Sequence, residues 1–593
     1  MTSTSERAFR NAPNAHLPSQ PRLFGTHGAV ASESYLATQA GADMLKQGGN
    51  AVDAGVAAAF VEGTANPQMY TIGGECPILV RMADTGRVVC INGNTAAPGR
   101  ATVDAYRQRG LSDIPDSGIL AAGVPAAFGA LVTSLMHFGR LPLKDVLEPA
   151  LRLCKEGMPA HQGLVVQEKF GIRALADLFR DQWPGSAALY LPNNQVPVAG
   201  QVLRNPALAD VYQYLIHEEQ SAGGDREKGL EAALNGFYKG DVAASIAAYS
   251  RERDGLLERD DLAGFETLLE EPASVQYENA RLYKCGFWNQ GLALLQCLTI
   301  LRHFDLRAMG HNSADYLHHL VETIKLAFAD REQYYGDPRH VPVPEELLSD
   351  DYGRDRAALI DSQRAHAEIM PGDPAAGEAV LPVARRLGGR SWGPGTVHVN
   401  AADAEGNMIA LTPSGAWIKS AEVMPELGFP LGNRLMTFYL EPEHHPNRVA
   451  PYKRPRTTIS PSLAEREGKP WAVFGSMGGD QQDQWQLQYF LNRVVFDMTV
   501  PEAIHAPKVS SEHFPGFFAP HSFFGKRVRI ESRVEAGIRD ELARRGHDVD
   551  AGADWSEGFL LATERDIETG VLETGCDPRG AKGEVFAPLA LAW

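Results

Sequence analysis

Apolar residues recur at helical spacing over much of the first half of the chain. A first helical run, near residues 34–47, ends at the Gly48-Gly49 pair, and an Ala-rich run that could pack closely follows it. A long amphipathic run with the period of about 3.6 residues typical of helices ends at Gly336-Asp337-Pro338. Residues 120–330 are mostly helical in pattern, with short strands near 281–287. The sequence therefore predicts helices near 34–47, 50–63 and 313–338.

Alternating apolar and polar residues predict strands, and these become denser after residue 395. Residues 77–93 and 396–412 each contain two such runs around a Gly-containing turn, which predicts two hairpins. "PWAVFGSMGG" (470–479) predicts a strand that ends in a glycine pair, and residues 527–546 predict a strand followed by a helix. The summed pattern indicates an α+β protein with antiparallel sheets covered by helices.

Two segments lack this periodicity. Residues 1–25 are rich in Pro, Ser and Asn, and we predict that they form an N-terminal arm. Residues 362–395 are rich in Gly, Pro, Ala and Arg and are much longer than the usual loop of roughly 4–6 residues. We predict that this second segment is a mobile connector.

Composition narrows the classes of partner. The 74 acidic residues exceed the 56 basic residues, giving a net charge of −18, which disfavours binding to nucleic acid or to an anionic membrane. The six cysteines form no metal-type spacing, so we expect buried free thiols, no metal and no organic cofactor. We see neither the apolar core of a signal peptide nor an apolar run of membrane-spanning length. These features predict a soluble, cytoplasmic protein.

The junction between the connector and the second hairpin carries candidate chemistry. A threonine hydroxyl is a weak nucleophile and needs a base beside it. A threonine at a chain terminus carries its own base, an α-amine with a reference pKa of about 7.7–8.0. Gly395 places no side chain in the path of the Thr396 hydroxyl toward its carbonyl carbon. The same hydroxyl could therefore cut the chain and later attack a substrate amide; the alternative is an ordinary loop that meets a β-branched strand residue.

Four segments share one order and spacing with a known family, and they are listed here by position: 48–60 with 72–80, 317–338, 396–412, and 453–463 with 475–480. On these segments the chain resembles the gamma-glutamyltranspeptidase family of N-terminal-nucleophile hydrolases. The resemblance implies a four-layer αββα sandwich, made by a precursor that cuts itself into two subunits. Here these would be residues 26–395 and 396–593, a heterodimer that forms one domain, with residues 362–395 as a free tail.

The resemblance also implies roles for residues around the cleavage site. Thr396 matches the nucleophile and His398 matches the histidine two positions later. Ser414 stands where the family usually has a second threonine near the nucleophile's amine. Gly478 and Gly479 match the glycine pair whose backbone N–H groups form the oxyanion hole, a role that can stabilise a transition state by a few kcal/mol.

At the substrate end the chain departs from the family pattern. Thr457 and Thr458 occupy the paired hydroxyl position that touches the substrate carboxylate, but Asn94 replaces the arginine that holds the glutamyl α-carboxylate. Thr437 replaces the acid that holds the substrate amine. Because an α-amino acid head needs both partners when it is desolvated, a glutamyl group should bind poorly. Arg434, where a Gln or Glu is usual, could grip a carboxylate in a bidentate fashion or form a structural ion pair.

The sequence thus predicts a self-processing amidohydrolase or acylase that acts on a small-molecule amide. Its acyl group would carry a carboxylate but no α-amine, which resembles the oxamate-amidohydrolase and acylase branches of the family. Trp417, Trp485 and Phe287-Trp288 could supply aromatic walls. Two alternatives stay open: a true gamma-glutamyl hydrolase or transferase that acts on glutathione-like compounds, and an unprocessed, non-catalytic binding protein.

Overall fold

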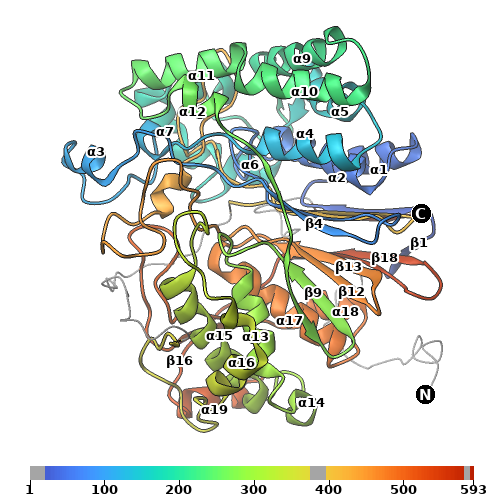
Figure 1. Ribbon diagram of the computed structural model, residues 1–593, viewed down its shortest axis with the longest axis vertical. Helices are drawn as coiled ribbons and strands as arrows, with labels where there is room; N and C mark the ends of the chain where they lie inside the picture. The colour runs from blue at the N-terminus through green and yellow to red at the C-terminus, as the bar shows by residue number, and fades with distance from the viewer. Residues whose placement is uncertain (1–20, 374–394, 580–587) are drawn as a thin grey trace.

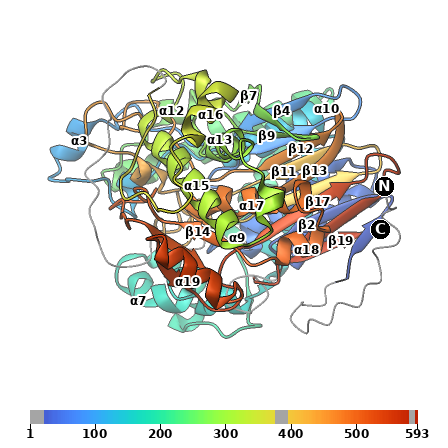
Figure 2. The ribbon, with the colours of Figure 1, turned by 90° about the horizontal axis from the view of Figure 1, so that it is seen from below.

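The computed structural model describes residues 21–373, 395–579 and 588–593. Figure 1 shows four layers, in which helices cover both outer faces of two stacked sheets, and Figure 2 shows the same layers from below. The predicted αββα sandwich is confirmed. No helix among the described residues combines the length and the apolar character needed to cross a membrane.

Among the described residues, each of the two large sheets has seven strands, all paired antiparallel. The first sheet has the order β1 (Leu23–Gly25), β18 (Leu572–Cys576), β17 (Leu560–Arg565), β13 (Lys469–Ser476), β12 (Ser462–Arg466), β9 (Ala280–Lys284) and β8 (Ala273–Tyr277). The second has the order β19 (Leu589–Ala592), β2 (Gly28–Ser32), β10 (Val399–Asp403), β11 (Met408–Leu411), β3 (Ile78–Arg81), β4 (Val88–Asn92) and β7 (Leu268–Glu270). Both sheets combine strands from before and after residue 395, so neither part of the chain can form its sheets alone.

Helices form the two outer layers. The second sheet is covered by α1 (Tyr35–Lys46), α2 (Ala51–Ala65) and α4 (Ala127–Phe138), on which α5 (Leu143–Glu156), α9 (Pro206–Ser221) and α10 (Arg226–Tyr238) form a further tier. The first is covered by α13 (Leu292–Leu301), α17 (Gln482–Val494) and α18 (Val500–His505), and α15 (Ala314–Tyr334) packs on α13. The other helices are α3 (Val103–Arg107), α6 (Gln162–Val166), α7 (Ile172–Gln182), α8 (Pro184–Tyr190), α11 (Asp241–Glu252), α12 (Arg259–Ala263), α14 (Leu306–Met309), α16 (Asp350–Ala357) and α19 (Ala536–Arg544). Two small sheets join β5 (Met158–Pro159) to β6 (Val202–Leu203), and β14 (Val509–Ser511) to β15 (Arg527–Ile530) and β16 (Asp548–Ala551).

Apolar side chains fill all three spaces between the layers. Strand β3 illustrates the principle, because successive strand residues point to opposite faces of a sheet. Ile78 and Val80 pack toward the helices with Phe60 of α2, whereas Leu79 packs between the sheets with Val473 of β13. All of these side chains are buried. The site-bearing hairpins are thus held from both faces.

The predicted elements are largely confirmed, with one correction. Both predicted hairpins form, as β3–β4 and β10–β11. Residues 23–25 form strand β1 rather than part of an arm, while residues 1–20 lie outside the described part. Within the predicted connector, residues 362–373 form no helix or strand, and the Gly372 N–H donates to Asp330 at 2.6 Å; its mobility stays a prediction. Residues 374–394 lie outside the described part, and the division into two subunits stays a prediction.

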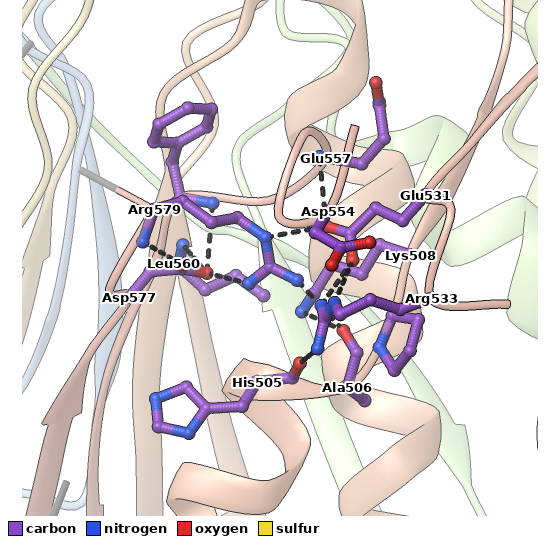
Figure 3. Close-up of polar contacts among 12 residues, drawn as sticks. His505, Ala506, Lys508, Glu531, Arg533, Asp554, Glu557, Leu560, Asp577 and Arg579 are labelled. Atoms are coloured by element: carbon purple, nitrogen blue, oxygen red, sulfur yellow. Dashed lines mark hydrogen bonds and ion pairs between the residues drawn. The ribbon is translucent and has the colours of Figure 1, made fainter. Parts of the chain in front are cut away.

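The end of β18 is fixed by a buried charged network (Figure 3). The Arg579 guanidinium binds Glu531 at 2.8 Å and Asp577 at 2.7 Å, and it donates to the carbonyl oxygens of Ile504 and Ala506, each at 3.1 Å. The two carboxylates and two carbonyls satisfy a cation that water cannot reach, as a buried charge requires. The network ties the end of β18 to the C-terminal end of α18.

A second buried ion pair joins the two parts of the chain across residue 395. Lys284 of β9 lies 2.8 Å from Asp483 of α17, and both side chains are fully buried. We expect Lys284→Met to lower the free energy of unfolding by about 3–5 kcal/mol, because the buried Asp483 carboxylate then loses its cationic partner. The exposed pair between Lys469 and Glu568, at 3.2 Å, provides the control, and Lys469→Met should cost less than about 1 kcal/mol. Denaturant unfolding midpoints measure both, and equal small effects would contradict the prediction.

Candidate active site

Four neighbouring strands of the second sheet bring the site residues to one end of that sheet. Thr396 precedes β10, Ser414 follows β11, Glu75 precedes β3 and Asn94 follows β4. Because adjacent strands in the order β10-β11-β3-β4 are antiparallel, these four flanks meet at the same end. Isolated β-bridges pair Ser414 with Thr396 on one side and with Glu75 on the other. The backbone thus fixes Ser414 between the predicted nucleophile and a buried carboxylate.

The Ser414 hydroxyl is the centre of the hydrogen bonding. Its Oγ lies 3.0 Å from Thr396 Oγ1, 2.6 Å from the Gly395 carbonyl oxygen and 2.5 Å from Arg434 Nη2. A hydroxyl has one proton and two lone pairs. The Gly395 carbonyl can only accept and the Arg434 guanidinium can only donate, so the Ser414 proton points to Gly395. The remaining lone pair accepts the Thr396 proton.

The Gly395 carbonyl oxygen has a second donor. The indole Nε1–H of Trp417 donates to it at 2.5 Å. A Cβ built on Gly395 would lie 2.8 Å from Cε2 and Cζ2 of this indole, which is too close for a real side chain. The close approach of the ring therefore requires a glycine at this position.

Arg434 forms a buried ion pair with Glu75, the structural alternative to a carboxylate-binding role. It lies in the short 3-10 turn Arg434–Thr437, and its Nε donates to Glu75 Oε1. Both side chains are almost fully buried. Burial raises the pKa of the Glu75 carboxyl, and the Arg434 charge opposes that rise. Among the described residues Arg434 Nη1 has no hydrogen-bond partner, so a carboxylate-binding role remains a prediction.

Aromatic rings and a second cation surround Trp417. Phe170 meets the Trp417 ring edge-on, with centroids 5.3 Å apart, and Phe518 lies 6.2 Å away. The Lys419 ammonium lies 4.2 Å from the centroid of Phe170 and 5.7 Å from that of Trp417. Burial lowers the pKa of Lys419. Trp417 thus lines the site as expected.

The other aromatic residues named as walls pack elsewhere: Trp485 and Trp288 are buried, and Phe287 is partly buried. Trp485 packs near Phe559, with ring centroids 5.9 Å apart, and the Trp288 indole donates to Glu270 at 2.8 Å. Phe287 contacts Tyr335 edge-on at 5.4 Å. None of these three contacts involves Thr396.

The predicted oxyanion and hydroxyl residues lie at one end of the β12–β13 hairpin in the first sheet. Thr457 and Thr458 precede β12, while Gly478 and Gly479 follow β13. Gln290 joins the two loops, because its N–H donates to the Thr457 carbonyl at 2.9 Å and its Nε2 to the Gly479 carbonyl at 3.2 Å. Both glycines have positive φ, 125° and 58°, which side-chain-bearing residues adopt rarely.

This second group faces the first through Phe518. A Cβ on Gly479 would lie 3.5 Å from the Phe518 ring, and that ring lies 5.9 Å from the Arg434 guanidinium. No hydrogen bond among the described residues joins Gly478 or Gly479 to Thr396 in the uncleaved chain. Their roles as oxyanion donors, and those of Thr457 and Thr458, stay predictions.

Three further predicted positions have side chains that are already engaged. The Asn94 amide donates to the Pro455 carbonyl at 2.6 Å, and the Thr437 hydroxyl donates to the carbonyl of Arg434 at 2.8 Å. His398 is buried between Thr412 Oγ1 at 2.9 Å and Asn400 Oδ1 at 2.8 Å. Burial lowers the pKa of His398 to about 3, so the ring is neutral at pH 7. It supports the hairpin and does not contact the nucleophile.

One group among the described residues has the composition of a metal site. His318, Glu322 and His547 offer ligand atoms within 4.8 Å of one another. However, the two imidazoles bind each other at 2.9 Å, and the Lys325 ammonium lies 2.6 Å from Glu322 Oε1. Because a cation already neutralises the carboxylate, we assign no ligand to this group.

The sequence interpretation missed two residues of the site. Glu75 lies in "IGGECPILV", a segment used for the family resemblance but given no role, and Phe518 lies in a loop without a recognised motif. A buried arginine needs an anionic partner, so Arg434 was the signal that a carboxylate should be sought nearby. The sequence predicts Trp417 only as an aromatic wall of the site, and no sequence pattern indicates that its N–H is a donor there.

Comparison with known proteins agrees with this geometry. The sequence profile described as "Gamma-glutamyltranspeptidase" matches residues 37–587. The "Glutathione hydrolase proenzyme" of Escherichia coli (strain K12) is 30% identical over 506 residues, covering 82% of this chain and 81% of the relative. The "Acylase ACY 1 proenzyme" of Pseudomonas sp. (strain V22) is 31% identical over 543 residues and covers 88% of each chain.

Two solved structures share the whole fold. "Structure of LmbA2991HD" superposes with a TM-score of 0.91 at 40% identity, covering 97% of this chain and 100% of the other. The "cephalosporin acylase from Bacillus halodurans" superposes with a TM-score of 0.83 at 28% identity, covering 99% of each chain. The chain therefore belongs to the gamma-glutamyltranspeptidase family and is an enzyme of its amide hydrolase and acyltransferase type.

Proposed function

We propose that this enzyme cuts itself between Gly395 and Thr396 and then hydrolyses an amide whose acyl group carries a carboxylate but no α-amine. The observation that carries the proposal is the arrangement at Ser414, whose hydroxyl contacts the Thr396 hydroxyl at 3.0 Å and the Gly395 carbonyl at 2.6 Å. A nucleophile and the bond that it must break are thus held by one side chain. The proenzyme names of the relatives agree with a processed precursor.

In the processed enzyme, the freed α-amine of Thr396 takes the proton from its own hydroxyl, and Oγ1 attacks the substrate carbonyl. The backbone N–H groups of Gly478 and Gly479 hold the resulting oxyanion. Collapse expels the amine product, which takes up the proton, and leaves an ester on Thr396. Water then attacks this ester and releases the carboxylic acid.

The engaged side chains support an acyl group without an α-amine. Asn94 donates to a backbone carbonyl and Thr437 to the backbone of its own turn, so neither offers the charge that an amino acid head needs. Glu75 is neutralised by Arg434 and does not provide a free anion for an ammonium group. Two positive groups lie near the aromatic rings, namely Lys419 and the unpartnered Nη1 of Arg434. A carboxylate on an apolar acyl chain would find complementary partners there.

The relatives include both glutathione hydrolases and acylases, so the alternative of a gamma-glutamyl hydrolase is kept as an outcome of the experiment. An unprocessed binding protein is disfavoured by the contacts among Thr396, Ser414 and Gly395, which a scaffold would not need.

Self-cleavage should depend on the Ser414 hydroxyl. In Ser414→Ala the Gly395 carbonyl loses one of its two donors and Thr396 loses its proton acceptor. We expect the rate of cleavage to fall by about 10²–10³-fold, the usual cost of one oxyanion donor. Ser414→Thr keeps the hydroxyl and should still cleave. Cleavage is followed on denaturing gels as the loss of the 64.4 kDa chain, and equal rates for Ser414→Ala and wild type would contradict this role.

Substrate preference can be tested with a matched pair of anilides. Glutaryl and gamma-glutamyl p-nitroanilides differ only by the α-amine, and butyryl p-nitroanilide lacks the carboxylate as well. We expect the highest kcat/KM for the glutaryl compound, because a desolvated ammonium would lack an anionic partner and a butyryl group would offer no acceptor to Lys419 or to Nη1 of Arg434. Higher kcat/KM for the gamma-glutamyl compound would establish the alternative instead.

The variant Thr396→Ala separates both hypotheses from a non-catalytic protein. It should stay uncleaved and hydrolyse none of the anilides, and N-terminal sequencing of the wild-type small fragment should begin at Thr396. A wild-type protein that remains one chain and turns over no anilide would support the binding protein.

A further inference from the structure

We propose that Trp417 is a catalytic residue of the self-cleavage: its indole N–H stabilises the oxyanion that forms on Gly395 when Thr396 attacks. This inference rests on the proposed function and concerns its first step. It assigns to an aromatic side chain the donor role that backbone N–H groups usually have.

The contacts at the scissile carbonyl carry the inference. Among the described residues, the Gly395 oxygen accepts two hydrogen bonds, one from Trp417 Nε1 at 2.5 Å and one from Ser414 Oγ at 2.6 Å. Two donors on one carbonyl oxygen are the arrangement that stabilises a tetrahedral intermediate. Both donors are buried, with Trp417 only 3% exposed, so water does not weaken the interaction.

The indole is held rigidly in this orientation. Phe170 packs against it edge-on at 5.3 Å, and the Arg434 guanidinium lies 5.1 Å from its ring centroid. On the other side Gly395 lies directly against the ring, where any Cβ would come within 2.8 Å of it. The donor is thus fixed before the reaction, and no reorganisation is needed when charge develops on the oxygen.

The step balances without any external reagent except water. Thr396 Oγ1 forms a bond to the Gly395 carbonyl carbon while its proton passes to Ser414 Oγ and the Ser414 proton passes to the carbonyl oxygen, whose developing negative charge the Trp417 N–H stabilises. When the carbonyl re-forms, that proton returns to Ser414. The carbon–nitrogen bond then breaks, the Thr396 nitrogen receives a proton through Ser414, and an ester joins Gly395 to Thr396. Water hydrolyses this ester to the Gly395 carboxylate and the free Thr396 hydroxyl.

The direct experiment is Trp417→Phe, which keeps most of the ring and removes the N–H. After cell-free synthesis is stopped, we expect the intact chain to disappear about 10²–10³-fold more slowly than in wild type. Trp471→Phe is the matched control, because Trp471 is also 3% exposed and its indole N–H donates to Glu564 at 3.1 Å, a bond that involves no site residue. The control should cleave at the wild-type rate.

A second variant tests the same contact without altering the tryptophan. In Gly395→Ala the new Cβ must push the carbonyl away from the indole, and we expect at least tenfold slower cleavage. In the double variant Gly395→Ala/Trp417→Phe, the smaller Phe ring reduces the clash with the new Cβ. The slowing of cleavage should therefore be less than the product of the slowing in the two single variants. A non-multiplicative result would also distinguish a direct contact from general misfolding, which thermal unfolding of each variant checks independently.

The outcomes separate this inference from the proposed function. Cleavage of Trp417→Phe at the wild-type rate, or independent effects of the two substitutions in the double variant, would overturn the role of Trp417. The proposed function would still stand if Thr396→Ala remained uncleaved. Cleavage of Thr396→Ala at the same bond would overturn both.

Discussion

The site depends on one constraint, the limited hydrogen-bonding capacity of the Ser414 hydroxyl. It has one proton and two lone pairs, and the Gly395 carbonyl, Arg434 and Thr396 use all three. Because Arg434 can only donate and the carbonyl can only accept, the direction of every hydrogen bond follows. The Thr396 hydroxyl therefore donates its proton to Ser414. In this way an electrostatic pair, Arg434 with Glu75, sets the orientation of a neutral nucleophile.

The two stacked sheets make this arrangement rigid. Thr396 and Ser414 flank the two strands of one hairpin, and Glu75 precedes the next strand, so their separations are set by the strand spacing of about 4.8 Å. Apolar side chains hold this hairpin on both faces, which leaves few alternative positions for its ends. The turn of the hairpin is also fixed, since Asp403 accepts the N–H groups of its own turn and that of Ala51 at the start of α2. Thr396, the proposed nucleophile, thus lies at the end of a hairpin that is held on both faces and at its turn.

Much of this could be predicted from local sequence, and the failures have identifiable physical causes. The helices and both hairpins followed from apolar periodicity and glycine turns, and they locate Thr396 and Ser414 at neighbouring strand ends. The strand at residues 23–25 was missed because it is short and is stabilised by pairing with Leu572–Cys576, far away in sequence. Glu75 and Phe518 were missed for the same reason, since their roles come from contacts with Arg434 that no local pattern records. The sequence departure at Arg434 could be recognised, but only the position of Glu75 shows that the Arg434 charge forms an ion pair within the protein.

The buried environment also bears on the catalytic base of the proposed function. A free α-amine has a reference pKa of about 7.7–8.0, so in water it would be largely protonated at pH 7 and unable to accept the hydroxyl proton. Thr396 is only 4% exposed, and burial disfavours the ammonium form. The nearest carboxylate of the site, Glu75, could restore that form, but it is bound to Arg434 and accepts the N–H of Thr95. The ion pair therefore has a second consequence: it keeps the Glu75 carboxylate from holding the proton on the amine. The same pairing that orients Ser414 in the precursor would keep the amine neutral, and so reactive as a base, once the chain is cut.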